Sequence, residues 1–246
     1  AAHRRVSGKS KFSIDETSQL ANAFNISLNN LFFKRNKVSI EKTIEITSLE
    51  DLLIYFKNSS NYIQQYANNE DSLLYYSAKD IPLFYFLDGS IISKFKAYIW
   101  LTLLNPDQPK KHFEEFVIDV SFMEHTQKLK EIYEKTTVNE VWNDTTINSS
   151  LQQILYFYEA GLLTAKNAIA LDKDLKRILK LIKDKAGNPN SKHSIYYNEL
   201  ILLNNNLLIQ SSEKLTMFIP YTLLGYFITN NDEGCKNVLR FFNQQM

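Results

Sequence analysis

The residue types at the start of the chain could bind phosphate. His3, Arg4, Arg5, Ser7 and Lys9 fall within nine residues. Arginine and lysine donate to phosphate oxygens and base edges, and histidine and serine side chains hydrogen-bond to a nucleic-acid backbone. The cluster predicts contact with DNA, and the alternative is an exposed basic surface.

The distribution of charge supports the same prediction. Residues 1–44 carry eight Lys or Arg and three acidic residues, a net charge of +5. The rest of the chain carries 20 basic and 24 acidic residues, a net charge of −4. A basic N-terminal part on a mildly acidic remainder suits a phosphate-backbone partner at one end only.

The sequence gives little support for nucleotide binding, metal binding or catalysis. Gly8-Lys9-Ser10 matches the end of a nucleotide-binding loop, but such a loop needs a glycine at the position of His3 and a strand before it. The four histidines and the single Cys235 lack metal-ligand spacing, and the chain has no Gly-x-Ser-x-Gly motif. Adjacent Glu114 and Glu115 are typical of a solvated helix. We therefore expect no catalytic residues, no metal and no cofactor.

Polar side chains in the middle of the chain are candidates for binding a small effector. One group joins charges to a rigid turn before Pro82, and the other places amides at helical spacing after a tryptophan. Structural roles in capping and the core are the alternative for both groups. The candidates are Lys79, Asp80, Trp142, Asn143, Asn148 and Gln152.

Composition predicts a cytoplasmic globular protein. Apolar residues make up 44% of the chain and charged residues 22%, which is ordinary for a soluble domain. One cysteine cannot form an internal disulfide framework, and residues 1–11 lack the apolar core of a signal peptide. No segment approaches the roughly 20 apolar residues of a membrane span, so we expect no membrane contact.

Periodicity predicts an α+β, mostly helical chain in two parts. In residues 1–36, Gly8 should end a first helix and Ser13 with Glu16 should cap a second. Ser27 should begin a third, after Asn25 ends the second. Residues 34–46, starting with Lys34, Arg35 and Lys37, should form an extended connector. Apolar spacing predicts helices over 48–67, 91–104, 112–135, 147–160 and 164–186.

The last sixty residues change to a strand-like pattern. We predict strands at 195–203 and 207–210 joined by a hairpin turn at Asn204–Asn206, because asparagine tolerates positive φ. A third strand at 215–219, a helix from Pro220 and a final helix at 233–244 should follow. The domain of residues 47–246 would be helical over 47–190 and end in a small antiparallel sheet with terminal helices over 191–246.

Segments of the N-terminal part resemble the second half of a lambda-repressor-like (Cro-type, XRE-like) helix-turn-helix domain. The resemblance rests on residues 2–10, Ser13–Glu16 and 24–32. Segments 74–84, 95–100, 141–143, 147–154 and 197–200 resemble long regulators of this class from Bacteroidetes. Peptide-pheromone-sensing regulators have similar heads, but their bodies are helical repeats throughout, from which the hairpin pattern departs.

The resemblance implies a cytoplasmic transcription regulator that binds double-stranded DNA as a homodimer. Ala2 would belong with His3, Arg4, Arg5, Ser7 and Lys9 to the end of the recognition helix. The C-terminal domain would dimerise and could sense a small-molecule or peptide effector. The two preceding helices would be missing, so this chain should bind DNA weakly. The alternative is a non-enzymatic ligand- or protein-binding module whose basic N-terminal part is structural.

Overall fold

The structure is a computed structural model. It describes the whole chain except residues 1, 25, 27, 29–37, 68, 70, 106–109, 119, 201–202 and 213. The chain divides into two compact units, the head (residues 1–39) and the body (residues 40–246).

The head holds two short helices, α1 (Ala2–Val6) and α2 (Ile14–Ala23). Gly8 ends α1 with a φ of 72°, a left-handed conformation that glycine adopts without steric cost. The Ser13 hydroxyl accepts from the Glu16 N–H, and the Glu16 carboxylate accepts from the Ser13 N–H, which confirms the predicted capping box. An ion pair between Arg5 and Glu16 joins the two helices. The third helix predicted here, with Asn25, Ser27 and residues 31–33, falls mainly outside the described residues.

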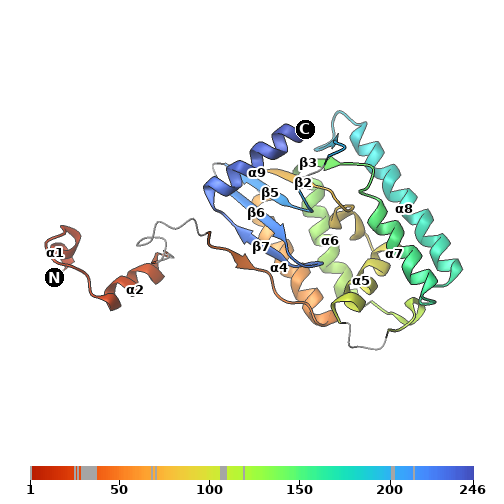
Figure 1. Cartoon of the computed structure of the whole chain (residues 1–246), viewed down its shortest axis with the longest axis horizontal. Helices are drawn as coiled ribbons and strands as arrows, with labels where there is room; N and C mark the ends of the chain where they lie inside the picture. Colours follow the sequence, from red (N-terminus) through yellow and green to blue (C-terminus); the bar gives the residue numbers. More distant parts are fainter. Residues whose placement is uncertain are drawn as a thin grey trace. The chain divides into compact units, whose positions relative to one another are not determined.

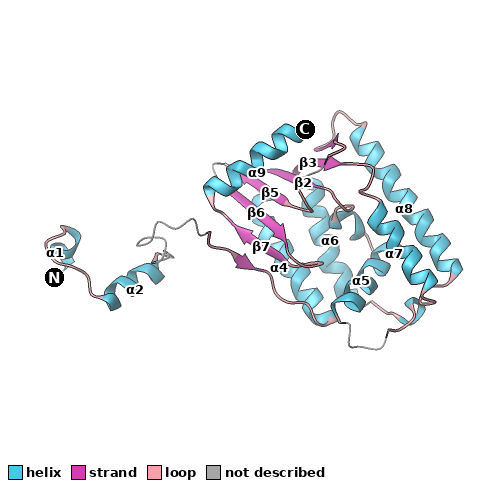
Figure 2. Cartoon of the chain, in the orientation of Figure 1, coloured by secondary structure: helices cyan, strands magenta, loops and turns pink. Residues whose placement is uncertain are grey.

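The body is built on one mixed sheet (Figures 1 and 2). Its order is β1-β7-β6-β5-β2-β3-β4, with β2–β3 and β3–β4 parallel and the other pairs antiparallel. The strands are β1 (Glu41–Lys42), β2 (Leu73–Ser77), β3 (Thr137–Trp142), β4 (His193–Tyr197), β5 (Leu207–Ser211), β6 (Lys214–Pro220) and β7 (Tyr226–Thr229).

Helices cover both faces of this sheet. They are α4 (Leu49–Ala67), α5 (Ile91–Leu104), α6 (Val120–Lys135), α7 (Asn148–Glu159), α8 (Ala165–Ala186) and α9 (Asp232–Gln245), with 3₁₀ turns η1 (Leu83–Phe86) and η2 (Phe113–Glu115). α4 and α6 pack on one face, where Phe56 and Leu129 meet Leu74 and Val138. α9 packs on the other face, where Phe242 meets Tyr75 (Figure 1). α5, α7 and α8 build a second core beside the first.

The α+β prediction and four of the five helices predicted between 48 and 186 are confirmed. The fifth, predicted over 112–135, is an α-helix only from Val120 and is preceded by the 3₁₀ turn η2. The body is not helical throughout 47–190. β2 and β3 lie inside that range. β2 is buried along nearly its whole length. A strand buried on both faces has a continuous apolar sequence, which periodicity cannot distinguish from a segment of buried helix.

The predicted hairpin at Asn204–Asn206 is wrong, and so is the small antiparallel sheet. β4 pairs with β3 and β5 pairs with β2 and β6, so the asparagines connect distant strands of a larger mixed sheet. The Asn205 side chain and the Asn206 carbonyl instead accept hydrogen bonds from backbone N–H groups at the end of β2 and in the loop after it. The Asp80 N–H donates to Asn205 Oδ1 at 2.8 Å, and the Ser77 N–H donates to the Asn206 carbonyl at 3.0 Å. The hairpin is β5–β6, which turns at Ser212 with a φ of 54°.

The predicted helix from Pro220 is also wrong. Pro220 ends β6 and pairs with Tyr226 of β7, across a turn in which the Tyr221 N–H donates to the Gly225 carbonyl. The third strand and the final helix are confirmed as β6 and α9. The connector contains the two residues of β1, and its basic residues Lys34, Arg35 and Lys37 lie outside the described residues.

Candidate functional site

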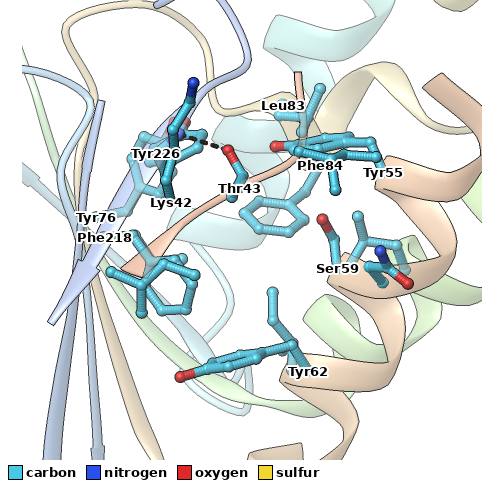
Figure 3. A pocket seen from close by; sticks show the side chains of 16 residues that line it. Lys42, Thr43, Tyr55, Ser59, Tyr62, Tyr76, Leu83, Phe84, Phe218 and Tyr226 are labelled. Atoms are coloured by element: carbon cyan, nitrogen blue, oxygen red, sulfur yellow. Dashed lines mark hydrogen bonds between the residues drawn. The ribbon is translucent and has the colours of Figure 1, made fainter. Parts of the chain in front are cut away.

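A cavity of about 210 Å³ lies between α4 and the sheet of the body and opens to solvent beside Lys42 and Asn58 (Figure 3). Its apolar walls come from η1, α6 and the strands, and include Leu83, Phe84, Leu129, Leu207 and Phe218. From α4, Ser59 and Tyr62 point toward the same space. A void of this size is larger than the 150 Å³ engineered cavity that binds benzene.

Three tyrosine hydroxyls form the polar end of the cavity. Tyr55 comes from α4, Tyr76 from β2 and Tyr226 from β7. The hydroxyls of Tyr76 and Tyr226 lie near each other, and the Tyr55 hydroxyl lies near Ser59, so each pair interacts electrostatically. Burial raises the pKa of all three phenols, so they stay neutral at physiological pH. The cavity therefore offers neutral hydrogen-bonding groups.

One wall is a short segment at the sheet edge, residues 41–44, which we call the β1 strap. Its pairing to β7 covers two residues, Glu41 opposite Ile228 and Lys42 opposite Phe227. Thr43 extends the attachment: its N–H donates to the Tyr226 carbonyl at 3.0 Å, and its hydroxyl accepts from the Tyr226 N–H at 2.9 Å (Figure 3). One residue, Ile40, separates the strap from the last residue of the head.

Charge is nearly excluded from the cavity lining. Of the described residues that line it, Lys42 alone is charged, and its ammonium lies 5.6 Å from the ring centroid of Tyr221, a residue outside the lining. The carboxylate of Asp80 acts through space on Tyr76 and Tyr226 and raises the pKa of both phenols further. The interior thus lacks a cation that could pair with an anionic ligand, among the residues that the structure describes.

A second polar cluster lies under the sheet around Glu140. This carboxylate is completely buried, and it accepts hydrogen bonds from the Tyr85 and Tyr133 hydroxyls at 2.7 Å and from Trp142 Nε1 at 2.6 Å. His193 Nδ1 lies 3.7 Å from the carboxylate. Burial, followed by the Glu140 charge, raises the pKa of both tyrosines. Glu140 thus accepts three hydrogen bonds at the junction of β3 with η1 and α6.

A buried lysine organises a third cluster. Lys96 Nζ donates to Ser150 Oγ at 2.9 Å and to Gln153 Oε1 at 2.7 Å, and lies 3.9 Å from an Asp80 carboxylate oxygen. The Phe86 ring centroid lies 4.4 Å from Nζ. Burial lowers the pKa of Lys96, and Asp80 partly opposes that shift. These contacts tie α5 to α7 and to the loop after β2.

The structure separates the predicted effector-binding residues. Asp80 belongs to the Lys96 cluster and also accepts from the Ser149 hydroxyl. Trp142 belongs to the Glu140 cluster, and the Asn143 side chain accepts from Thr145 in a turn. Lys79, Asn148 and Gln152 are exposed. The lining residues of the cavity include none of the six.

The predicted DNA-contact residues lie on α1 and the turn after it. His3, Arg4, Ser7 and Lys9 are exposed, whereas Arg5 is held by Glu16. Ala2 begins α1, and its side chain is outside the described part of the molecule. The head also exposes many apolar side chains: among its described residues, the buried apolar side chains are limited to Ala21. The large exposed ones are Val6, Phe12, Ile14, Leu20, Phe24, Ile26 and Val38.

Sequence reasoning missed the cavity residues because their aromatic side chains read as core. One signal was present in the sequence. Tyr55, Tyr76 and Tyr226 are phenols where phenylalanine would fill a core equally well, and a buried hydroxyl needs a partner.

Comparison with known proteins gives no relative. The chain matches no family model, no curated protein and no solved structure. Within the described residues, no helix has the length and apolar character to cross a membrane, and no three His, Cys, Asp or Glu side chains gather as metal ligands do.

Proposed function

We propose that the chain is a sequence-specific DNA-binding transcription regulator whose body binds a small molecule. The observation that carries the proposal is the connection between the two units. The basic head is followed in the sequence, after Ile40, by the β1 strap, and that strap forms a wall of the cavity. A ligand that changed how the strap sits on β7 would act on the segment from which the head extends.

The chemistry of the head supports contact with DNA. Arg4 and Lys9 are exposed on α1 and its turn, and neither has an ion pair among the described residues. Arg5 has a different role, because its pairing with Glu16 holds α1 against α2. The exposed apolar side chains of the head suit a unit that packs against further helices, as a helix-turn-helix domain does.

The proposal includes a homodimer, since such heads read paired half-sites. Leu151, Leu155 and Tyr158 are each at least 40% exposed, and their spacing puts them on one face of α7. A second copy would bury this face in an isologous contact. Leu155→Lys should therefore shift the chain toward the monomer in sedimentation equilibrium, whereas Gln152→Lys on the same helix should not.

The test of DNA binding is fluorescence anisotropy of the full-length gene product against its own upstream DNA and a scrambled duplex. We expect tighter binding to the upstream DNA and a steep fall in affinity with salt, because phosphate contacts release counterions. Arg4→Ala with Lys9→Ala should weaken binding about tenfold or more. The matched control is Lys173→Ala with Lys180→Ala on exposed positions of α8.

Two results would count against the regulator. Equal binding to both duplexes would remove sequence specificity. No binding to either, with or without a cavity ligand, would favour a ligand-binding module with a structural head.

A further inference from the structure

We infer that the cavity binds a neutral aromatic molecule of one or two rings that carries one hydroxyl or carbonyl group. Size is the first reason. A cavity of 150 Å³ accepts benzene, so one of about 210 Å³ should accept roughly eight to ten non-hydrogen atoms.

The shape and chemistry of the walls favour an aromatic body. Phe84 and Phe218 lie on different sides of the space, and Tyr62 closes it from α4 (Figure 3). The Tyr62 and Phe218 rings already meet edge to face, with centroids 5.4 Å apart. An aromatic ring among them can make further offset or edge-to-face contacts, which contribute beyond the area that they bury.

The polar end favours a single neutral hydrogen-bonding group. The hydroxyls of Tyr55, Tyr76 and Tyr226 can donate a hydrogen bond to a ligand carbonyl. They can either donate to or accept from a ligand hydroxyl. A carboxylate there would enter without a facing cation and close to the Asp80 charge that already acts on two of the phenols. An ammonium would lose its hydration in a mostly apolar space. Both kinds of ion should therefore be rejected.

The test is isothermal titration calorimetry of the whole chain with 5-indanol, which has ten non-hydrogen atoms and one hydroxyl. The comparison ligands are indane, which lacks the hydroxyl, and indane-5-carboxylate, which is an anion. We expect 5-indanol to bind with a dissociation constant on the order of 100 µM or below. Indane should bind several-fold more weakly, and the carboxylate should not bind in this range.

Two variants test whether the ligand binds in this cavity. Ser59→Phe should fill the cavity and abolish binding of 5-indanol and indane, and Gln65→Phe on the exposed face of α4 is the matched control. Tyr226→Phe should weaken 5-indanol about threefold to tenfold and leave indane unchanged, because it removes one hydrogen-bonding hydroxyl. The different effects of Tyr226→Phe on 5-indanol and indane test the site even if the Ser59→Phe variant fails to fold. A thermal melt shows whether that variant folds.

Binding should also protect the strap. The amides of Thr43 and Tyr226 should exchange hydrogen more slowly when 5-indanol is bound, because both lie in the attachment of the strap to β7. Three results would overturn the proposal: no binding of 5-indanol, equal binding to the Ser59→Phe variant, or tighter binding of the carboxylate. All are measured without DNA, so a head that fails to bind DNA overturns the proposed function and leaves this ligand class standing.

Discussion

Replacing Glu140 with glutamine should destabilise the body although the side chain keeps its size. The carboxylate accepts three hydrogen bonds, from Tyr85, Tyr133 and Trp142. An amide offers one oxygen and one NH₂ group. If the oxygen stays with the tyrosine hydroxyls, the NH₂ group faces the N–H of Trp142, at a separation of 2.6 Å in the native pair. Two donors then meet in a buried space.

The magnitude follows from these contacts. A hydrogen bond to a charged group contributes about 1.5–3 kcal/mol, and a buried donor left without a partner costs about 1–3 kcal/mol. Glutamine also removes the cost of burying a carboxylate, which offsets part of the loss. We expect Glu140→Gln to lower the free energy of unfolding by about 2–4 kcal/mol. Reversing the amide does not help, because it leaves two hydroxyls without their acceptor.

Urea unfolding followed by circular dichroism measures this change, and a double-mutant cycle tests its cause. In a Trp142→Phe background the facing N–H is gone, so Glu140→Gln should cost about 1–3 kcal/mol less than in the wild type. Glu134→Gln, at a part-exposed ion pair with Lys130, is the control and should stay within about 0.5 kcal/mol. An equal cost of Glu140→Gln in both backgrounds would refute the reasoning.

Three further predictions concern single sites. Lys96→Met leaves a buried acceptor on Ser150 and a part-buried acceptor on Gln153 without their donor and should cost about 2–4 kcal/mol in urea unfolding; a neutral result would contradict it. Burial raises the pKa of Tyr55, so the folded state keeps a proton that the unfolded state loses above pH 10. The free energy of unfolding should therefore fall above that pH. Tyr55→Phe should make this fall less steep by up to about 1.4 kcal/mol per pH unit, as measured by urea unfolding at several pH values. Gly89→Ala should lower the melting temperature, because φ is 75°, a backbone conformation that residues with a Cβ rarely adopt; an unchanged melting temperature would refute that.

The elements that the sequence predicts well are those with local causes. α8 presents Leu171, Leu175, Ile178 and Ile182 to the core at helical spacing, and each of them is buried as expected. The capping box at Ser13 needs only a serine and a glutamate three residues apart. Such features depend on neighbours within one or two turns, so periodicity and residue type suffice to find them.

Periodicity and residue type could not predict the strand order of the sheet. Packing across the whole body determines which strands pair with β4 and β5. The sequence of a strand such as β2 does not indicate its register, because both of its faces are buried. The cavity depends on that topology: its phenols come from positions 55, 76 and 226. A tyrosine in a buried pattern suggests a partner for its hydroxyl, but the sequence does not say which one.

The attachment of β1 to β7 sets a constraint on biosynthesis. The hydrogen bond between Tyr226 and Thr43 joins residues 183 positions apart, and the strands that complete the cavity wall extend to Thr229. A chain emerging from the ribosome therefore presents the strap long before its partner strand exists. During that interval residues 41–44 have no sheet edge to join, and the wall of the cavity is incomplete. The cavity between α4 and the sheet is therefore complete only once synthesis has passed β7.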